Sequence, residues 1–117
     1  MKIIACRVGQ KAQIENIYPH LHYYQEFVDG YIETITSILG YVLVCNEEGR
    51  LKKLPFNPTL SYFRALMFGF PELIYGNYFI AYMGDEDFID IPDNEMTQEI
   101  IKDLNMERSG QYAHWEE

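Results

Sequence analysis

The residues that could carry covalent catalysis are few in this chain. Cys6 and Cys45 each lie inside an apolar run, and a cysteine nucleophile would also need a histidine close by to take its proton. The histidines are His20, His22 and His114. The serines are Ser37, Ser61 and Ser109, and none stands in the G-x-S-x-G turn that exposes a serine nucleophile. The sequence therefore predicts a protein without enzymatic activity and without catalytic residues.

Metal binding is the next chemistry to consider. His20 and His22 are two residues apart, a spacing that suits one face of a strand but separates the rings on a helix. Pro19 and the apolar spacing that follows it favour a helix here. The chain also lacks the glycine-rich sequence patterns of phosphate-binding loops. We therefore predict neither a metal site nor a cofactor.

Acidic residues are concentrated in the last third of the chain. Residues 1–82 carry seven acids and seven bases, whereas residues 83–117 carry eleven acids and only two bases, so the last third supplies the whole net charge of −9. Direct binding of nucleic acid through its phosphates needs a basic patch, which the sequence lacks. The acidity is interpreted either as a means of staying soluble or as an imitation of DNA.

One acidic cluster is a candidate interaction surface. It comprises Asp85, Glu86, Asp87 and Asp90. The calcium-loop pattern, with a glycine at its sixth position and a glutamate at its twelfth, is absent. The cluster is instead typical of a solvated turn between two strands. If this surface imitates DNA, we expect its partner to be a DNA-handling protein that binds less tightly as salt is added.

Tyrosine is frequent, with 10 residues among 117. Because tyrosine buries a ring while keeping a polar end available, it suits both half-buried strands and binding sites. The candidate ligand or interface residues are Tyr31, Glu33 and Asn57. If Ile32 faces the core, Tyr31, Glu33 and Ile35 form an outward row. Such a row forms either one side of a pocket for a small ligand or a flat interface, and a homodimer is one form of that interface.

The predicted elements follow the order ββαβββ(α)ββα. Strands are expected at residues 2–8, 12–17, 31–38, 41–45, 51–54, 73–75, 78–83 and 88–91. Helices are expected from Pro19 to a left-handed stop at Gly30, over residues 59–68, and from Pro92 or Asp93 to Leu104. This order predicts an α+β fold, with an antiparallel or mixed sheet and two or three helices packed on one side of it.

The length of 117 residues predicts a single domain, which we place at residues 1–104. Residues 105–117 are a polar tail, for which disorder and docking through Trp115 are both considered. No segment has the length of a signal peptide or of a membrane span, so we expect a cytosolic protein with buried cysteine thiols. The residues expected to be buried together are Ile32, Val42, Val44, Ile80, Ile100 and Leu104.

Several segments resemble the family known as domain of unknown function 3846. The more specific ones are Gly30-Tyr31-Ile32-Glu33, Leu43-Val44-Cys45-Asn46-Glu47-Glu48-Gly49-Arg50-Leu51, and Leu54-Pro55 with Asn57. A looser similarity runs from Ile74-Tyr75-Gly76 through Asp87-Phe88-Ile89 to the start of the last helix. The resemblance covers roughly residues 2–104.

Members of that family are small proteins of bacterial phages, plasmids and other mobile elements, and the family label carries no activity. The resemblance therefore implies a protein of the cytoplasm of a bacterial host cell. We expect a non-enzymatic accessory protein that binds a host or phage protein stoichiometrically, with antagonism of host defence as one role. The alternatives are sequestration of a small nucleotide-type ligand and acidic DNA mimicry.

Overall fold

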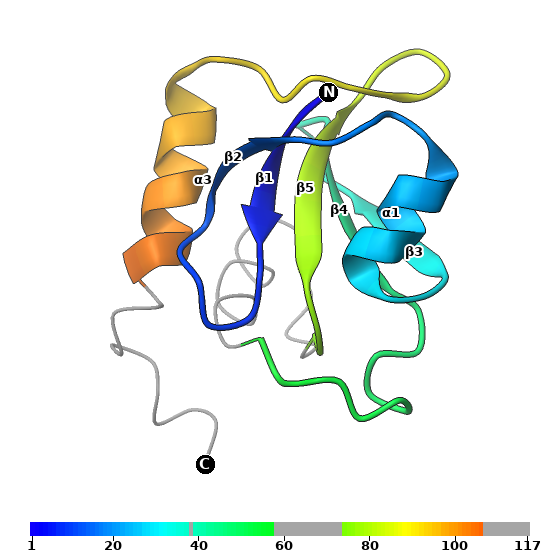
Figure 1. The fold of residues 1–117 in the computed structure, drawn as a ribbon. Coiled ribbons are helices and arrows are strands. Elements are labelled where there is room, and N and C mark those ends of the chain that lie inside the picture. The colour runs from blue at the N-terminus through cyan, green and yellow to red at the C-terminus, as the bar shows by residue number, and fades with distance from the viewer. Residues whose placement is uncertain (38, 58–73, 107–117) are drawn as a thin grey trace.

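The computed structural model of the protein describes residues 1–37, 39–57 and 74–106. In this part of the chain, six strands form one antiparallel sheet in the order β2-β1-β5-β4-β3, with β6 paired to the end of β5 (Figure 1). The strands are β1 (Lys2–Cys6), β2 (Gln13–Asn16), β3 (Ile32–Thr36), β4 (Tyr41–Asn46), β5 (Tyr78–Met83) and β6 (Phe88–Ile89). The helices are α1 (Leu21–Val28) and α3 (Glu95–Met106). The predicted α+β class is confirmed.

The two central strands are covered on both faces of the sheet. Every residue of β4 is buried, and so are the first four residues of β5. Their register places Leu43 beside Ile80 and Val44 beside Phe79. Because neighbouring residues of a strand point to opposite faces, a strand that is apolar throughout needs a cover on each side.

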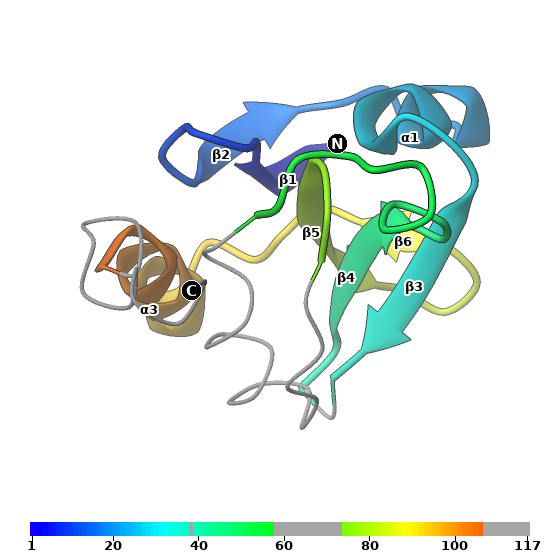
Figure 2. The ribbon, with the colours of Figure 1, turned by 90° about the horizontal axis from the view of Figure 1, so that it is seen from below.

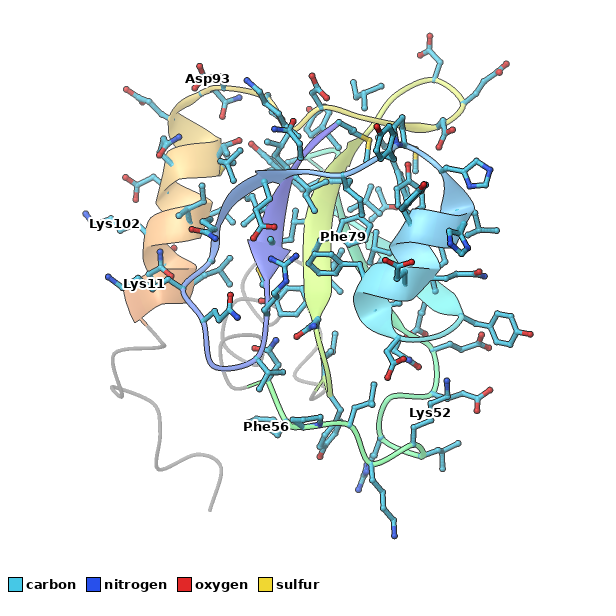
Figure 3. All side chains as sticks on the ribbon, in the orientation of Figure 1. Lys11, Lys52, Phe56, Phe79, Asp93 and Lys102 are labelled. Carbon is cyan, nitrogen blue, oxygen red and sulfur yellow. The ribbon has the colours of Figure 1, made fainter. Side chains whose placement is uncertain are left out.

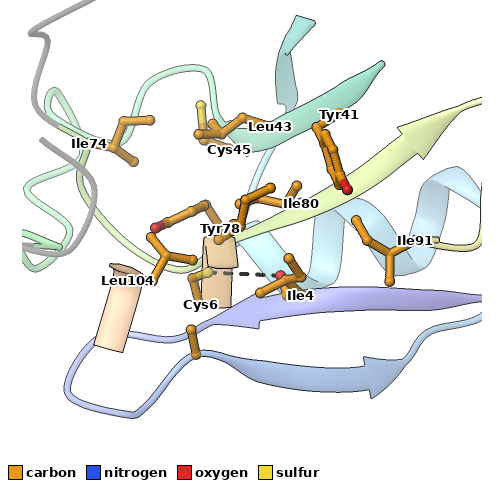
Figure 4. Packing of buried hydrophobic residues seen from close by; sticks show 12 residues of the cluster. Ile4, Cys6, Tyr41, Leu43, Cys45, Ile74, Tyr78, Ile80, Ile91 and Leu104 are labelled. Carbon is orange, nitrogen blue, oxygen red and sulfur yellow. Dashed lines mark hydrogen bonds between the residues drawn. The ribbon is translucent and has the colours of Figure 1, made fainter. Parts of the chain in front are cut away.

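The helices supply these two covers from opposite sides (Figure 2). On one face, Ile100 and Leu104 of α3 belong to the same cluster as strand residues such as Ile4, Leu43 and Ile80 (Figure 4). On the other face, α1 packs on the sheet through two buried residues, Tyr24 and Val28. The strand residues in that second cluster are Ile3, Ala5, Val42, Val44, Phe79 and Ala81.

The prediction that the helices lie on one side of the sheet is therefore wrong. The predicted core is also divided between the two faces. Ile80, Ile100 and Leu104 lie on the α3 face, whereas Val42 and Val44 lie on the α1 face with half-buried Ile32 packed against them. The division follows from the alternation of side chains along each strand.

α1 is fixed at both ends by side chains. His20 is its N-cap, and the ring Nδ1 accepts a hydrogen bond from the backbone N–H of His22 at 3.2 Å. The left-handed residue at its C-terminal end is Asp29, with φ of 63°, which corrects the prediction of Gly30. The amide of Asn46 donates to the carbonyls of Val28 and Asp29 at 3.0 and 2.8 Å. These bonds satisfy carbonyls that the end of a helix leaves unpaired.

α3 begins at Glu95, two or three residues later than the predicted Asp93 or Pro92, because Asn94 provides the cap. The side-chain oxygen of Asn94 accepts from the backbone N–H of Thr97 at 2.9 Å. The buried hydroxyl of Thr97 lies 2.9 Å from the hydroxyl of Tyr41 on β4. The first turn of α3 is therefore tied directly to the centre of the sheet.

The region after β4 differs from the prediction. Residues 51–54 form turns and not a strand, with Lys53 at a φ of 59°. Gly49 is packed so closely that an added Cβ would lie 2.6 Å from the carbonyl oxygen of Tyr75. Of the predicted strand 73–75, the described part contributes only an isolated bridge between Tyr75 and Phe56. The predicted helix at 59–68 lies outside the described residues.

The last helix continues to Met106, and the rest of the predicted tail lies outside the described residues. The amide of Asn105 joins α3 to Ala12, accepting from its N–H at 2.8 Å and donating to its carbonyl at 3.1 Å. Cys6 and Cys45 are both buried thiols. Among the described residues, no helix is long and apolar enough to span a membrane.

Candidate functional site

The acidic cluster predicted from the sequence lies at one end of the sheet. Asp85, Glu86 and Asp87 are exposed in the turn between β5 and β6. Asp87 shapes this turn, because its carbonyl accepts from the N–H of Gly84 at 2.8 Å and its carboxylate accepts from the N–H of Phe88 at 2.7 Å. We call the four acids of the cluster, Asp85, Glu86, Asp87 and Asp90, the acidic end.

Asp90 is held in place by the first strand. Its carboxylate accepts a hydrogen bond from the backbone N–H of Lys2 at 2.9 Å, and the carbonyl of Lys2 accepts from the N–H of Ile91 at 2.9 Å. The chain thus crosses the end of β1 on its way to α3. Lys52 lies at the opposite end of the molecule from Asp93, the labelled acid in the segment that leads into α3 (Figure 3). The acidic end therefore lies far from turn 50–53, whose basic residues are Arg50, Lys52 and Lys53.

Beside the acidic end lie two shallow hollows that meet at Met1 and Pro19. One has a volume of about 450 Å³, and its other lining residues are Asn16, Ile17 and Tyr18. The second has a volume of about 470 Å³ and is completed by Phe88, Ile89 and Asp90. We call the two hollows together the terminal groove. The groove combines residues from the end of β2, the loop before α1, and β6.

The walls of the terminal groove leave apolar surface open to solvent. Tyr18 is 72% exposed and Ile89 is 48% exposed. Exposed apolar groups that gather around a hollow mark contact surfaces more often than isolated ones do. Because Asp90 lines the same groove, a partner that fills it meets both apolar surface and negative charge.

The groove rests on a packed aromatic base. The ring of Tyr24 lies 5.4 Å from that of Phe88 and 5.6 Å from that of Phe79, measured between ring centres. Burial raises the pKa of the Tyr24 phenol, and the negative charge of Asp87 raises it further. The acidic turn is therefore close enough to α1 for the two to interact electrostatically.

An exposed aromatic cluster continues from the groove along the start of α1. The rings of Tyr18 and Tyr23 are 5.2 Å apart, and the ring of His22 lies 5.3 Å from that of Tyr23. His22 also lies 3.6 Å from the carboxylate of Glu26, and His20 is used as the helix cap. Within the described part of the chain, no three His, Cys, Asp or Glu side chains are grouped for metal binding.

The other candidate residues from the sequence lie elsewhere. Tyr31 and Glu33 are exposed at strand β3, where the Glu33 carboxylate lies 3.8 Å from the Cys45 sulfur. Asn57 is fully buried, and its amide nitrogen donates to the carbonyls of Cys6 and Gly76, both at 3.1 Å. Asn57 therefore joins the ends of β1 and β5, and its role as a ligand or interface residue stays a prediction. The interpretation of Tyr31 and Glu33 as pocket or interface residues stays a prediction.

Sequence reasoning missed the apolar part of the site. The sequence predicts Ile17 in a strand, Pro19 at the start of a helix and Phe88 in a closing strand, without any link between them. The signal that the sequence does contain is the alternation of Phe88 and Ile89 directly after the acidic turn, which leaves one of the two facing out. Their meeting with Met1 depends on strand order, which the sequence does not specify.

The described chain is thus a small α+β domain in which one antiparallel sheet lies between two helices, with an acidic, apolar-lined groove at one end. It belongs to the family described as domain of unknown function (DUF3846), which matches residues 1–105. The family resemblance is confirmed by this match. No curated protein and no solved structure matches the chain.

Proposed function

We propose that this chain is a non-enzymatic protein that binds a basic partner protein stoichiometrically at its acidic end. The observation that supports this proposal is the position of four carboxylates beside an open groove with apolar walls. A partner with an apolar side chain next to lysine or arginine residues matches both features. The acids alone would be a solubility feature, but the groove beside them adds a surface that a partner can bury.

The two features contribute differently to binding. Burial of exposed groups such as Tyr18 and Ile89 supplies affinity, because apolar and aromatic side chains in a contact are removed from water. The carboxylates speed association and select partners of opposite charge. Binding should therefore weaken as salt screens the carboxylates, but a salt-resistant part should remain.

Family resemblance supplies the proposed context. We propose that the partner is a host protein and that binding interferes with its action, as expected of an accessory protein of a phage or mobile element. Bacterial proteins that handle nucleic acids carry basic surfaces suited to an acidic end. The chemistry of the groove adds to this a requirement for an apolar anchor next to the basic residues.

A second candidate function is supported by the charges of α3. Glu95, Glu99 and Asp103 follow one another at intervals of four residues, so they lie along one side of the helix about 6 Å apart. A DNA mimic requires these carboxylates and those of the acidic end to face one partner together. A mimic of this kind needs the carboxylates but not the apolar walls of the terminal groove.

The test uses matched pairs of neutralised acids. The tagged chain is used to capture proteins from bacterial extract, and the captured protein is then purified and its Kd measured. In one variant, Asp85→Asn and Glu86→Gln remove two charges from the acidic end. In the control, Glu47→Gln and Glu48→Gln remove two exposed charges at the other end of the sheet. We expect the first variant to weaken binding at least about tenfold and the control to bind as the wild type does.

A third variant separates the two candidate functions. Ile89→Ser removes an apolar wall of the groove without changing charge. Groove binding predicts a Kd several times weaker, whereas DNA mimicry predicts no change. Equal retention of the partner by the Asp85/Glu86 variant and the Glu47/Glu48 control would refute both candidates.

A further inference from the structure

The second interaction surface is the outer edge of β3. In the ladder between β3 and β4, the carbonyl of Tyr31 accepts from the N–H of Glu47 at 2.9 Å, and the N–H of Ser37 donates to the carbonyl of Tyr41 at 2.8 Å. Hydrogen-bonded pairs alternate along an antiparallel ladder. The odd-numbered residues of β3 therefore bond to β4.

It follows that the even-numbered residues of β3 direct their backbone N–H and C=O groups away from the sheet. These residues are Ile32, Thr34 and Thr36, and both threonines are exposed. Among the residues that the structure describes, none makes a hydrogen bond to these outward groups. The strand carries no proline or lysine, the residues that commonly prevent pairing at an edge.

The opposite edge of the sheet is treated differently. At the start of β2, the outward N–H and carbonyl of Ala12 are both bonded by the amide of Asn105, at 2.8 and 3.1 Å. The Asn105 side chain thus takes the place of a neighbouring strand. The outward groups of Ile14 and Asn16 on β2 have no such bond among the described residues, so the difference is that β3 has none of its outward groups covered.

We propose that β3 pairs antiparallel with β3 of a second copy of this chain, about a two-fold axis at Ile35. Three two-fold registers pair the outward, even-numbered residues of the two copies with each other. Their axes lie at Glu33, Thr34 and Ile35, and the charge of Glu33 distinguishes them. An axis at Glu33 sets two carboxylates directly opposite each other, and an axis at Thr34 makes them diagonal neighbours, which like charges disfavour. An axis at Ile35 sets Glu33 opposite Ser37 of the second copy.

The exposed apolar side chains of this edge favour the same register. Tyr31 is 68% exposed and Leu39, in the turn after β3, is 46% exposed. With the axis at Ile35, Ile35 lies opposite its own copy, and Tyr31 of one copy lies at the end of the strand pair where the other copy turns through Leu39. Thr34 and Thr36 pair across the interface and exchange both backbone hydrogen bonds. The two exposed apolar groups that the structure describes at this edge, Tyr31 and Leu39, are thus brought together in an isologous dimer.

A proline tests the edge without breaking the sheet. Thr34→Pro removes an outward N–H, whereas the bonds to β4 come from the odd-numbered residues on either side. Thr34→Val keeps the N–H and serves as the matched control. Sedimentation of the full chain at concentrations up to about 1 mM should show a dimer for the wild type and the valine variant, and a dimer Kd at least about tenfold weaker for the proline variant. Thermal unfolding verifies that both variants are folded.

Disulfide trapping tests the register separately and does not depend on the proline variant. Residues that face each other in a non-hydrogen-bonded antiparallel pair have Cα atoms about 4.5 Å apart, within the range that a disulfide spans. With an added oxidant, Ile35→Cys should give a covalent dimer in much higher yield than Thr34→Cys, or than Glu33→Cys combined with Cys45→Ala, which removes the thiol opposite Glu33 within the chain. Trapping at Glu33 or Thr34 in preference to Ile35 would overturn the register.

Two results would overturn the pairing itself. One is a wild-type chain that stays monomeric at every concentration, which is also the result expected if the edge receives a strand of a different protein. The other is a dimer that the proline variant forms equally well. The turn after β3 lies at the same end of the sheet as the acidic turn, because the carbonyl of Gly40 accepts from the N–H of Met83 at 2.9 Å. Pairing at β3 uses its backbone groups and no residue of the acidic end, so neutralising Asp85 and Glu86 should leave a dimer, and failure here and failure of the proposed function are distinguishable.

Discussion

Replacing Leu104 by alanine should destabilise the fold strongly, because α3 is held to the sheet through this side chain. Leu104 is 0% exposed and belongs to the cluster that joins α3 to β1, β4 and β5. The same cluster contains Cys6, Leu43 and Ile80, whose backbones are fixed by strand pairing. The cavity left by the deleted atoms can therefore collapse only partly.

The expected loss in unfolding free energy is about 3–5 kcal/mol, the upper part of the range for a leucine truncated in a rigid core. For a domain of this length, that loss corresponds to a decrease in Tm of roughly 10–20 °C. Urea denaturation followed by circular dichroism measures the change. Lys102→Ala is the control, because Lys102 is exposed on the same helix and alanine keeps the helix propensity, so its effect should stay within about 0.5 kcal/mol. A loss below about 1 kcal/mol for Leu104→Ala, with an unchanged m value, would refute the view that α3 is integral to the fold.

Two further predictions concern buried or paired polar groups. Asn57→Ala should cost about 1–3 kcal/mol of unfolding free energy, measured by urea denaturation, because it removes the hydrogen bonds to Cys6 and Gly76; no loss would contradict a structural role. Burial alone would raise the pKa of Glu15, but hydrogen bonds from Arg7 and Gln13 and the charge of Arg7 together lower it. A carboxylate with a lowered folded-state pKa stabilises the fold above its unfolded pKa, and this contribution is lost as the pH falls through the folded pKa. The stability difference between wild type and Glu15→Gln should therefore be larger at pH 7 than at about pH 3, and a constant difference would contradict the assignment.

Local patterns were enough to predict the strands and helices at the centre of the fold. The apolar run from Tyr41 and the run from Tyr78 became β4 and β5, and the spacing of Ile100 and Leu104 placed them on the buried side of α3. The same runs contained evidence that the helices cover both faces, because a strand apolar at every position needs two covers. The prediction that both helices lie on one side leaves the second face of these strands without a cover.

Features that depend on distant contacts were not predicted. Residues 51–54 look like a strand by their apolar ends, yet Gly49 must approach the carbonyl of Tyr75, and this contact directs the chain into turns. Asp29 takes the left-handed conformation, whereas Gly30 has a φ of 154° and is needed for space, because Asn46 and Lys52 occupy the position where its Cβ would lie. These side chains come from later in the chain, so no local pattern could contain them.

Of the candidate site, the acidic turn could be predicted from the sequence and the terminal groove could not. The acidic turn is a local feature, and it was found from its sequence alone. The terminal groove joins Met1 to Pro19 and Ile89 through the pairing of β1, β2 and β5, and each part lies in a different segment. The acids therefore suggested a charged surface, and only the fold adds the apolar hollow beside them.

Hydrogen exchange of the chain with and without its captured partner tests the central claim most directly. If the acidic end and the terminal groove form the binding surface, the partner should slow exchange in residues 16–19 and 84–90 and leave turn 47–53 at the opposite end unchanged. Protection of turn 47–53 together with unchanged exchange in residues 84–90 would contradict the proposed site.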